Sequence, residues 1–467
     1  MGPLTGSAIR VVGRAELVPI AGGGARPYIN CDNAASTPAL EPVAAAVDRF
    51  LHWYSNVHRG TGFKSRLSSW AFEEARAIVA RFVGADPAGN VVIFCRNATE
   101  GLNRLAHRYP FRPDGVVITS VMEHHSNELP WRKVANVVHV AVSDDGRLDV
   151  ADLEARLAEH RGRVQLVALT GATNVTGFVN PIHTLARLAH AAGAEIAIDG
   201  AQLVPHRPVD MKPDGDPQHI DYLVFSGHKM YAPYGVGVLV GPRRTFLGGD
   251  PDLVGGGTVD IVTLEEAYWT DLPDKEEAGT PDIVGAVAVA KAIRVIEEIS
   301  WDAIVAHEQA LTARALARLA AIPGVAVYGG TDASDLTDRL GTIAFNVAGK
   351  PHALVAAVLA YEHGIGVRSG CFCAQPYVKA LLHVDQAAAR AMEERIRRRD
   401  RSAIPGAVRI SFGIYSTADE VDSVCDAIAA IARGEHRTDY RLDRERGEYT
   451  LPGADEAFDR YFSFDEA

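Results

Sequence analysis

The chain has 467 residues, an apolar fraction of 47% and a formal net charge of −12. This length can hold two or three domains with large cores. The negative charge argues against nucleic acid as a main partner, because phosphate binding needs a basic face. Apolar runs long enough to span a membrane are absent, and the N-terminal residues do not follow the pattern of a signal peptide.

Five cysteines are too few for a disulfide scaffold of this size, and their number is odd. We therefore expect a reducing, cytoplasmic setting. The chain contains no Cys-x-x-Cys pair, so we expect no structural zinc site and no metal.

The hydrophobic pattern divides the chain into four parts. Residues 1–27 are rich in Gly, Ala and Val and are predicted to form a loosely held arm. Residues 28–282 alternate short apolar runs with amphipathic stretches, which predicts a large α/β domain. Residues 283–434 open with a long helix and continue as a smaller α+β domain with an insertion at 377–407, and residues 435–467 form a charged extension.

The large domain is predicted to contain a mainly parallel sheet with helices on both faces. Its seven expected strands lie at 91–94, 116–119, 137–142, 165–170, 195–199, 222–225 and 236–240. Ligands of such sheets bind at the carboxyl ends of the strands. Polar residues occur at several of these ends, namely Thr99, His124, Asn174, Asp199 and His228.

Lys229 lies between two of the apolar runs, in the segment Ser226-Gly-His-Lys. A lone lysine is usually a surface residue whose stem packs on apolar neighbours. Here, however, Asp199 ends a neighbouring strand. A buried amine with a carboxylate close by is what a pyridoxal phosphate enzyme needs, since the lysine forms a Schiff base and the acid keeps the pyridine nitrogen protonated.

Further motifs extend this pattern from residue 28 to residue 433. They are 32–35 (Asp-Asn-Ala-Ala), 57–60 (Val-His-Arg-Gly), 98–103 (Ala-Thr-Glu-Gly-Leu-Asn), 122–127 (Met-Glu-His-His-Ser-Asn), 199–202 (Asp-Gly-Ala-Gln), 225–231 (Phe-Ser-Gly-His-Lys-Met-Tyr), 277–281 (Glu-Ala-Gly-Thr-Pro), 367–370 (Val-Arg-Ser-Gly), 373–376 (Cys-Ala-Gln-Pro) and 409–411 (Arg-Ile-Ser). In this order they resemble the class V aminotransferase group of fold-type I pyridoxal phosphate enzymes. Within that group the chain is most similar to group II cysteine desulfurases and selenocysteine lyases.

The resemblance implies a role for each matched residue. Lys229 would hold pyridoxal 5'-phosphate, Asp199 would pair with its ring nitrogen, His124 would stack on the ring and Gln202 would bind the ring oxygen. The phosphate would be bound by the backbone at Ala98 and Thr99, by Ser226 and His228, and by Thr280 of a second subunit, which implies a homodimer. The substrate would be bound by Arg409 at its carboxylate, by Asn174 at its amine and by His58 nearby. His124 and His125 could instead be satisfied core histidines, and His125 stays open.

Cys373 decides the reaction that the resemblance implies. The cysteine at this position in the family takes sulfur from L-cysteine as a persulfide and leaves alanine, and a protein could then accept the sulfur. The segment Cys371-Phe372-Cys373 departs from the desulfurase spelling and also resembles the sulfurase domain of molybdenum cofactor sulfurases, and we interpret Cys371 as a small buried hydrophobe. Alternatives on the same scaffold are a C–S lyase, a selenocysteine lyase or an aminotransferase. An inactive partner-binding chain is a third interpretation, and a nucleotide-binding dehydrogenase is excluded because no Gly-x-Gly-x-x-Gly follows the first strands.

Overall fold

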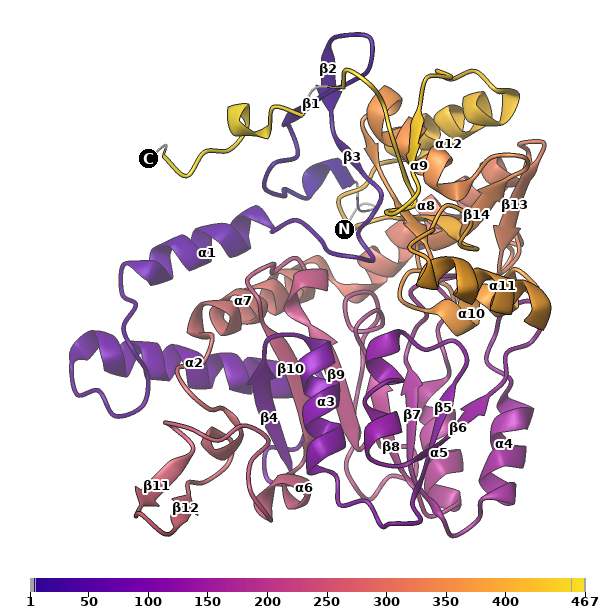
Figure 1. Ribbon diagram of the computed structural model, residues 1–467. Coiled ribbons are helices and arrows are strands. Elements are labelled where there is room, and N and C mark those ends of the chain that lie inside the picture. Colours follow the sequence, from indigo (N-terminus) through magenta and orange to yellow (C-terminus); the bar gives the residue numbers. More distant parts are fainter. Residues whose placement is uncertain (1–3, 5, 455, 466–467) are drawn as a thin grey trace.

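The computed structural model describes residues 4, 6–454 and 456–465, so residues 1–3 and 5 of the predicted arm lie outside it. Two bodies of secondary structure lie one above the other in Figure 1. The larger surrounds a seven-stranded sheet and the smaller a four-stranded sheet. Across the described residues, no helix is both long and apolar enough to cross a lipid bilayer.

The large sheet confirms the predicted α/β fold. Its strands are β4 (Asn90–Cys95), β5 (Val116–Ser120), β6 (Asn136–Val140), β7 (Val164–Thr170), β8 (Glu195–Asp199), β9 (Tyr222–Ser226) and β10 (Gly237–Pro242). They lie in the order β4-β10-β9-β8-β7-β5-β6, and only β10 runs antiparallel to its neighbours. Every residue of β4, β5, β9 and β10 is buried, as expected when helices cover both faces.

The helices of this body pack on the sheet and on each other. They are α1 (Glu41–Leu51), α2 (Phe63–Phe82), α3 (Ala98–Arg108), α4 (Val150–Glu159), α5 (Ile182–Ala191), α6 (Arg243–Leu247) and α7 (Ile283–Ile299). Helix α3 contacts β9 and β10, α5 contacts β8, and α1 and α2 pack against α7. A small hairpin of β11 (Val259–Val262) and β12 (Ala267–Trp269) extends from this body at the lower left of Figure 1.

The smaller body is an antiparallel sheet covered by helices. Its strands β13 (Val325–Tyr328), β14 (Thr342–Val347), β17 (Ala407–Ser411) and β16 (Arg368–Gly370) pair in that order. Helices α8 (Trp301–Ala320) and α9 (His352–His363) contact its strands, and α12 (Ala418–Arg433) packs against both of these helices. Helix α8 was not among the predicted elements.

The segment that follows the N-terminal arm belongs to the core of the smaller body. Strand β3 (Ile29–Asn30) pairs in parallel with β15 (Ile365–Gly366), and Ile29 and Cys31 pack with residues of α9 and α12. The predicted large domain began at residue 28, so its first strand lies with the other domain instead. The arm itself contains a hairpin of β1 (Leu17–Pro19) and β2 (Ala25–Pro27).

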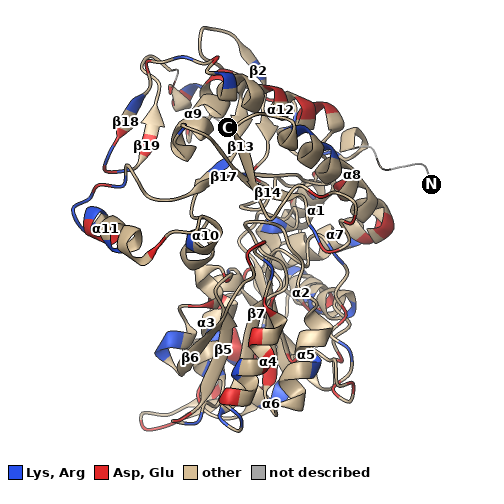
Figure 2. Cartoon of the chain, turned by 90° about the vertical axis from the view of Figure 1, so that its right-hand side faces the viewer, with Lys and Arg blue, Asp and Glu red and all other residues tan. Residues whose placement is uncertain are grey.

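The insertion and the C-terminal extension are folded and in contact. The insertion holds α10 (Gln375–Leu381) and α11 (Gln386–Arg397), and the extension forms a hairpin of β18 (Arg441–Asp443) and β19 (Glu448–Thr450). Ion pairs of 3.0 Å between Arg444 and Asp400 and of 3.2 Å between Arg399 and Glu445 join them. Figure 2 shows the two segments on the same side of the molecule. Short 3-10 turns complete the chain at Gly6–Ala8, His125–Asn127, Trp131–Lys133, Gly227–Lys229, Asp274–Glu276 and Phe458–Arg460.

Candidate active site

A cavity of about 330 Å³ lies where the carboxyl ends of β7, β8 and β9 face the smaller body. It brings together most of the residues predicted from the sequence, which are Ala98, Thr99, His124, Asn174, Asp199, Gln202, Ser226, His228, Lys229, Cys373 and Arg409. His58 and Thr280 are the two predicted residues that do not line it. The convergence follows from topology, because parallel strands end at one edge of their sheet.

One end of the cavity is the N-terminus of α3. Asn97 caps this helix by accepting a hydrogen bond from the backbone of Glu100, and Ser226 Oγ accepts a hydrogen bond of 2.8 Å from the Ala98 N–H. A Cβ atom at Gly237 would lie 2.5 Å from the Asn97 backbone, so glycine is required for the helix to start this close to β10. The positive end of the helix dipole at this N-terminus favours an anion in the cavity.

Asp199 ends β8, and Lys229 lies in the 3-10 turn that follows the neighbouring strand β9; both line the cavity. Burial lowers the pKa of Lys229 to about 8, although the Asp199 carboxylate opposes this shift. Burial raises the pKa of Asp199, while the Ala201 N–H and Lys229 act in the other direction. The Lys229 amine can therefore exchange a proton near neutral pH. A further positive charge beside the buried Asp199 would stabilise the ionised form of its carboxyl group.

Hydrogen bonding and burial define the tautomer and the charge of the His124 ring at the cavity. Its Nδ1 accepts a hydrogen bond of 3.1 Å from the Ser126 N–H, so the neutral ring carries its proton on Nε2. Burial lowers the pKa of His124 to about 4, and the positive charges of Lys229, His125 and Arg409 add to this effect. The ring is therefore uncharged at neutral pH.

A cluster of two arginines and one aspartate forms the upper wall. Asp32 accepts a hydrogen bond of 2.9 Å from Arg409 and forms an ion pair of 2.7 Å with Arg368. Arg409 is 3% exposed and also donates to the Asn174 carbonyl, but its Nε has no partner among the described residues. Two guanidinium groups around one carboxylate leave a net positive charge, which suits a substrate carboxylate.

Cys373 is exposed on a strained loop that reaches into the cavity. Phe372 and Cys373 both have φ of 54°, a left-handed conformation that costs non-glycine residues on the order of 1 kcal/mol each. Two neighbours hold the loop: Asn174 donates to the Phe372 carbonyl at 2.8 Å, and the His125 N–H donates to the Cys373 carbonyl at 2.7 Å. The Cys373 thiol is thus fixed in place while remaining accessible.

Several contacts differ from those the resemblance implied. Gln202 donates its hydrogen bond to the Ala34 carbonyl at 2.7 Å, and Asn174 binds the cysteine loop. All five cysteines lie in the described chain and are free, so Cys371 and Cys373 form no disulfide. His58 lies 3.6 Å from Asp274, away from the cavity, and Thr280 is exposed on the surface.

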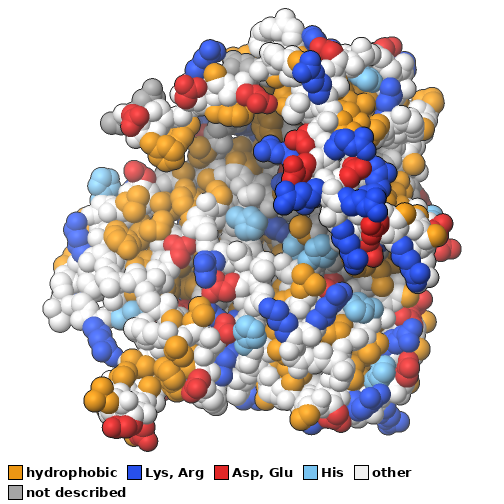
Figure 3. All heavy atoms as spheres, viewed as in Figure 1, with side chains coloured by type: hydrophobic (Ala, Val, Ile, Leu, Met, Phe, Trp, Pro, Cys, Tyr) orange, Lys and Arg blue, Asp and Glu red, His pale blue; other side chains and the backbone are white. Residues whose placement is uncertain are grey.

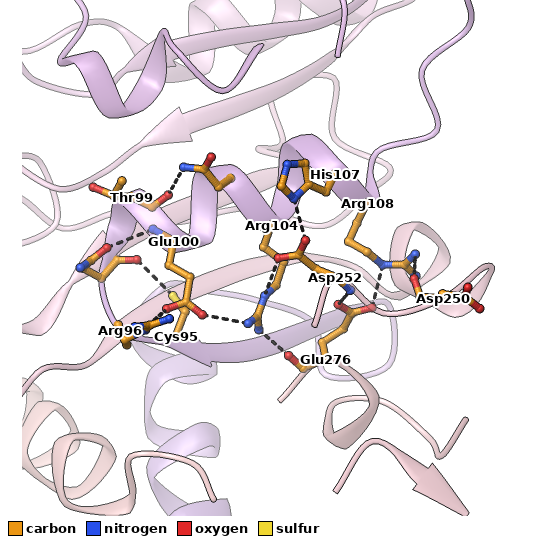
Figure 4. A network of polar contacts seen from close by, with 12 residues as sticks. Cys95, Arg96, Thr99, Glu100, Arg104, His107, Arg108, Asp250, Asp252 and Glu276 are labelled. Carbon is orange, nitrogen blue, oxygen red and sulfur yellow. Dashed lines mark hydrogen bonds and ion pairs between the residues drawn. The ribbon is translucent and has the colours of Figure 1, made fainter. Parts of the chain in front are cut away.

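The segment that carries Thr280 is anchored to the large body by the polar face of α3. Figure 4 shows Arg104 and Arg108 turned towards Glu276, and His107 turned towards Asp252. The Arg104–Glu276 carbonyl distance is 2.5 Å, and the Arg108–Glu276 carboxylate distance is 2.8 Å. The buried Arg104 and the half-buried Arg108 of α3 thus tie the segment before Thr280 to the large body.

Comparison with known proteins places this geometry in a family. Residues 29–424 match the aminotransferase class-V family. The chain belongs to the class V aminotransferase family. A cysteine desulfurase of Haloferax volcanii is 35% identical over 86% of this chain and 89% of its own, and one of Dickeya dadantii is 36% identical over 87% and 93%.

Solved structures of class V relatives agree. An apo structure of a cysteine desulfurase from Thermococcus onnurineus superposes with a TM-score of 0.76, with 33% identity over 87% of this chain and 95% of that one. A cysteine desulfurase from Escherichia coli gives a TM-score of 0.73 with 28% identity over 88% and 96%. The predicted fold-type I architecture is thereby confirmed.

Two charged residues at the cavity, Arg368 in its wall and Glu123 beside His124, received no role from the sequence. Arg368 was quoted only as part of a motif, yet it shares Asp32 with Arg409. Glu123, which precedes His124, is 2% exposed and is bound by Ser120 at 2.6 Å and Asn127 at 2.7 Å. Both residues are charged and lie within quoted motifs, which was a signal that the sequence offered. Their partners could not be recognised, because Asp32 is far from Arg368 in the sequence, and Ser120 and Asn127 are common polar residues.

Proposed function

We propose that this class V enzyme is a pyridoxal phosphate-dependent cysteine desulfurase that converts L-cysteine to L-alanine and receives the sulfur on Cys373. The observation that carries the proposal is the Cys373 loop, which is strained, hydrogen-bonded and placed in the same cavity as Lys229 and Arg409. The Cys373 thiol therefore lies where it can reach a substrate held by these two residues, and the thiolate is the nucleophilic form of a cysteine.

The residues of the cavity fit the cofactor that this family uses. The N-terminus of α3, with Ser226 and His228 beside it, suits the phosphate. Asp199 is a buried carboxyl group at the end of β8, where a protonated pyridine nitrogen would satisfy it. His124 offers a flat, neutral ring, and Lys229 supplies the amine for covalent attachment. When bound, pyridoxal phosphate supplies the electron sink for the reaction.

Each step of the reaction then has a residue to perform it. Arg409 binds the substrate carboxylate with its guanidinium group, and Lys229 Nζ moves the proton at the substrate Cα. The Cys373 thiolate attacks the substrate sulfur, the C–S bond breaks, and its electron pair stays with the substrate carbon. Protonation of that carbon gives alanine, and the enzyme keeps the sulfur as a persulfide. Because Cys373 is exposed, a thiol of a sulfur-acceptor protein can reach that persulfide.

We also propose a homodimer in which Thr280 completes the phosphate site of the partner subunit. Exposed apolar side chains gather around α1, α2 and the β11–β12 hairpin, on the left of the face in Figure 3. They include Trp53, Phe63, Trp70, Ile261, Val262, Leu264 and Tyr268. An apolar surface of this kind on a large protein indicates an interface, and Thr280 projects from the same region on an anchored loop.

The test is a product analysis with a matched variant. The purified holoenzyme is incubated with L-cysteine and a thiol reductant, and alanine, pyruvate and sulfide are measured for the wild type and for Cys373→Ala. We expect equal amounts of alanine and sulfide from the wild type, and loss of both in the variant while its visible cofactor band persists. Pyruvate with ammonia would instead establish a C–S lyase, and a requirement for a keto acid would establish an aminotransferase.

A further inference from the structure

Two histidines and an aspartate form a compact cluster at the end of the large sheet opposite the cavity. His190 lies near the C-terminal end of α5, His219 lies in the loop before β9, and Asp221 immediately precedes β9. One potential ligand atom from each lies within 4.8 Å of the other two. His190 Nε2 is 2.8 Å and His219 Nε2 is 3.2 Å from the carboxylate of Asp221, and the two imidazole rings stack with centroids 4.1 Å apart.

The other nitrogen of each ring fixes its tautomer. His190 Nδ1 lies 3.0 Å from the Pro217 carbonyl, and His219 Nδ1 lies 2.6 Å from the Asp216 carbonyl. A carbonyl oxygen only accepts, so both rings carry a proton on Nδ1. In the neutral rings, both Nε2 lone pairs therefore point at the Asp221 carboxylate, which is itself rich in electrons.

This arrangement is attractive only if a positive charge lies among the three groups. Protonation of both rings would supply this charge, but it would place two stacked cations with their centroids 4.1 Å apart. A third cation is already close, because the Arg244 guanidinium lies 3.6 Å from the Asp221 carboxylate. A divalent metal ion supplies the charge once and uses both lone pairs. Histidine ligands of metals characteristically donate their second N–H to a backbone carbonyl, as His190 and His219 both do here.

The dimensions agree with such a site. Ligand atoms about 2.0 Å from a tetrahedral zinc ion lie about 3.3 Å from one another. His190 Nε2 lies 2.8 Å from Asp221 Oδ2 and His219 Nε2 lies 3.2 Å from Asp221 Oδ1, both close to this value. The three ligand atoms lie within 4.8 Å of one another, so small side-chain rotations would bring them around one ion. Asp221 is 3% exposed and is held by the Ile196 N–H, whereas the histidines keep some contact with solvent. Solvent can therefore fill the fourth position.

We propose that His190, His219 and Asp221 bind one divalent transition-metal ion, with zinc as the expected ion. Two imidazole nitrogens and one carboxylate oxygen form a ligand set that suits this class of metal. The ion would join α5, the loop that ends at residue 220 and the amino end of β9, whose carboxyl end leads to Lys229. Its role is structural, because the cavity lies at the other end of the strand. The absence of Cys-x-x-Cys pairs predicted no metal, but the ligands proposed here are histidines and an aspartate from separate segments.

The test measures metal binding directly on the holoenzyme without a polyhistidine tag. A background with Cys371→Ser and Cys373→Ser removes the thiols that could also bind zinc. After chelation and dialysis, the protein is titrated with ZnCl₂ by calorimetry and with CoCl₂ by visible spectroscopy. We expect one ion per chain with a Kd below about 10 µM, and a rise in Tm on zinc addition.

The variants His190→Gln and His219→Gln should each weaken binding by at least roughly a hundredfold and abolish the rise in Tm. His183→Gln is the matched control, because His183 also lies on α5 and contacts the same loop through Gln218, but does not face Asp221. It should bind zinc as the wild type does. Wild-type crystals soaked in zinc should show an anomalous peak among the three side chains, which tests the site without any variant. Absence of stoichiometric binding, or binding that both glutamine variants retain, would overturn the proposal.

Discussion

At the scale of single residues, Asp32 sets the charge available to a substrate. It lies between Arg409 and Arg368, so the three side chains together carry one net positive charge. Arg368→Gln removes one cation and leaves Asp32 to neutralise Arg409. We expect the KM for L-cysteine to rise roughly threefold to tenfold, about 1 kcal/mol for a partly exposed charge, with a smaller change in kcat.

Steady-state kinetics of the purified holoenzyme measure this effect. Arg368→Lys is the control, because it keeps the charge and should keep a KM near that of the wild type. A fall in kcat at constant KM in the glutamine variant would instead place Arg368 in the chemical step and refute the charge argument.

Glu123 gives a second prediction at this scale, on stability against pH. Burial raises its pKa from 4.5 to about 8, and the charge of Asp199 adds to the shift. The folded protein therefore keeps the proton that the unfolded chain loses, and the stabilisation present below pH 4.5 is lost as the pH rises towards 8. The slope is at most about 1.4 kcal/mol per pH unit for one group.

Glu123→Gln removes this group while keeping its shape and its contacts with Ser120 and Asn127. We expect the free energy of unfolding of the wild type to fall relative to that of the variant as the pH rises from 5 to 8. Urea unfolding of the two proteins across this range measures it. A difference that stays constant with pH would show that Glu123 is ionised in the folded protein.

At the scale of elements, the cysteine loop is the part most finely positioned. Besides the backbone contact with Cys373, His125 Nε2 accepts a hydrogen bond of 3.2 Å from the Gln375 N–H at the start of α10. His125→Ala keeps the backbone contact and removes this one. One hydrogen bond is worth about 1 kcal/mol, so we expect sulfur transfer to Cys373 to slow roughly fivefold, with cofactor content unchanged.

Single-turnover labelling of the persulfide on Cys373 measures that rate. His160→Ala, at the C-terminal end of α4, is the control and should behave as the wild type. If His125→Ala transferred sulfur at the wild-type rate, the imidazole contact with Gln375 would not be needed. The hydrogen bonds to the Phe372 and Cys373 carbonyls would then be sufficient to position the loop.

The elements that the sequence predicted well are those whose environment is simple. Each buried strand of the large sheet is a continuous apolar run, and the polar residues of the cavity follow directly from where these runs end. Helix α8 was missed although Ile304, Leu311, Ala315 and Leu319 recur at helical spacing, because polar Glu308 and Thr312 are buried on the same face. The hairpin β18–β19 could not be predicted, since its short strands are exposed or half-buried and its contacts with the insertion are ion pairs of the turn residues Arg444 and Glu445.

At the scale of the whole molecule, the contacts that escaped prediction join distant segments. Strand β3 was assigned to the large domain, but its partner β15 lies more than 330 residues later, and no local pattern shows such a pairing. Residues of both bodies line the cavity. Of the phosphate-site residues that the family resemblance implies, Thr280 is the one outside the cavity, so the proposed site is complete only in a dimer.

Mixed dimers test this proposal directly. Lys229→Ala removes the reactive amine, and Thr280→Ala removes only the proposed contact to the partner's phosphate. Each homodimer should be impaired, the first completely and the second through weaker cofactor binding. In a mixed dimer, the subunit with intact Lys229 receives Thr280 from its Lys229→Ala partner, so one site of the two has every residue of the wild type.

We therefore expect mixed dimers, isolated with two different affinity tags, to bind pyridoxal phosphate at that site as tightly as the wild type and to have about half of its activity. If Thr280 acted within its own chain, the only site with Lys229 would still lack it, and the mixed dimer would show at most half the activity of the Thr280→Ala homodimer. The two outcomes differ even if Thr280→Ala is only mildly impaired. The affinity for the cofactor is measured at the one site that contains Lys229, and it equals that of the wild type only if the partner subunit supplies Thr280. Agreement with the first would also explain why an anchored, exposed loop carries a residue that its own cavity does not use.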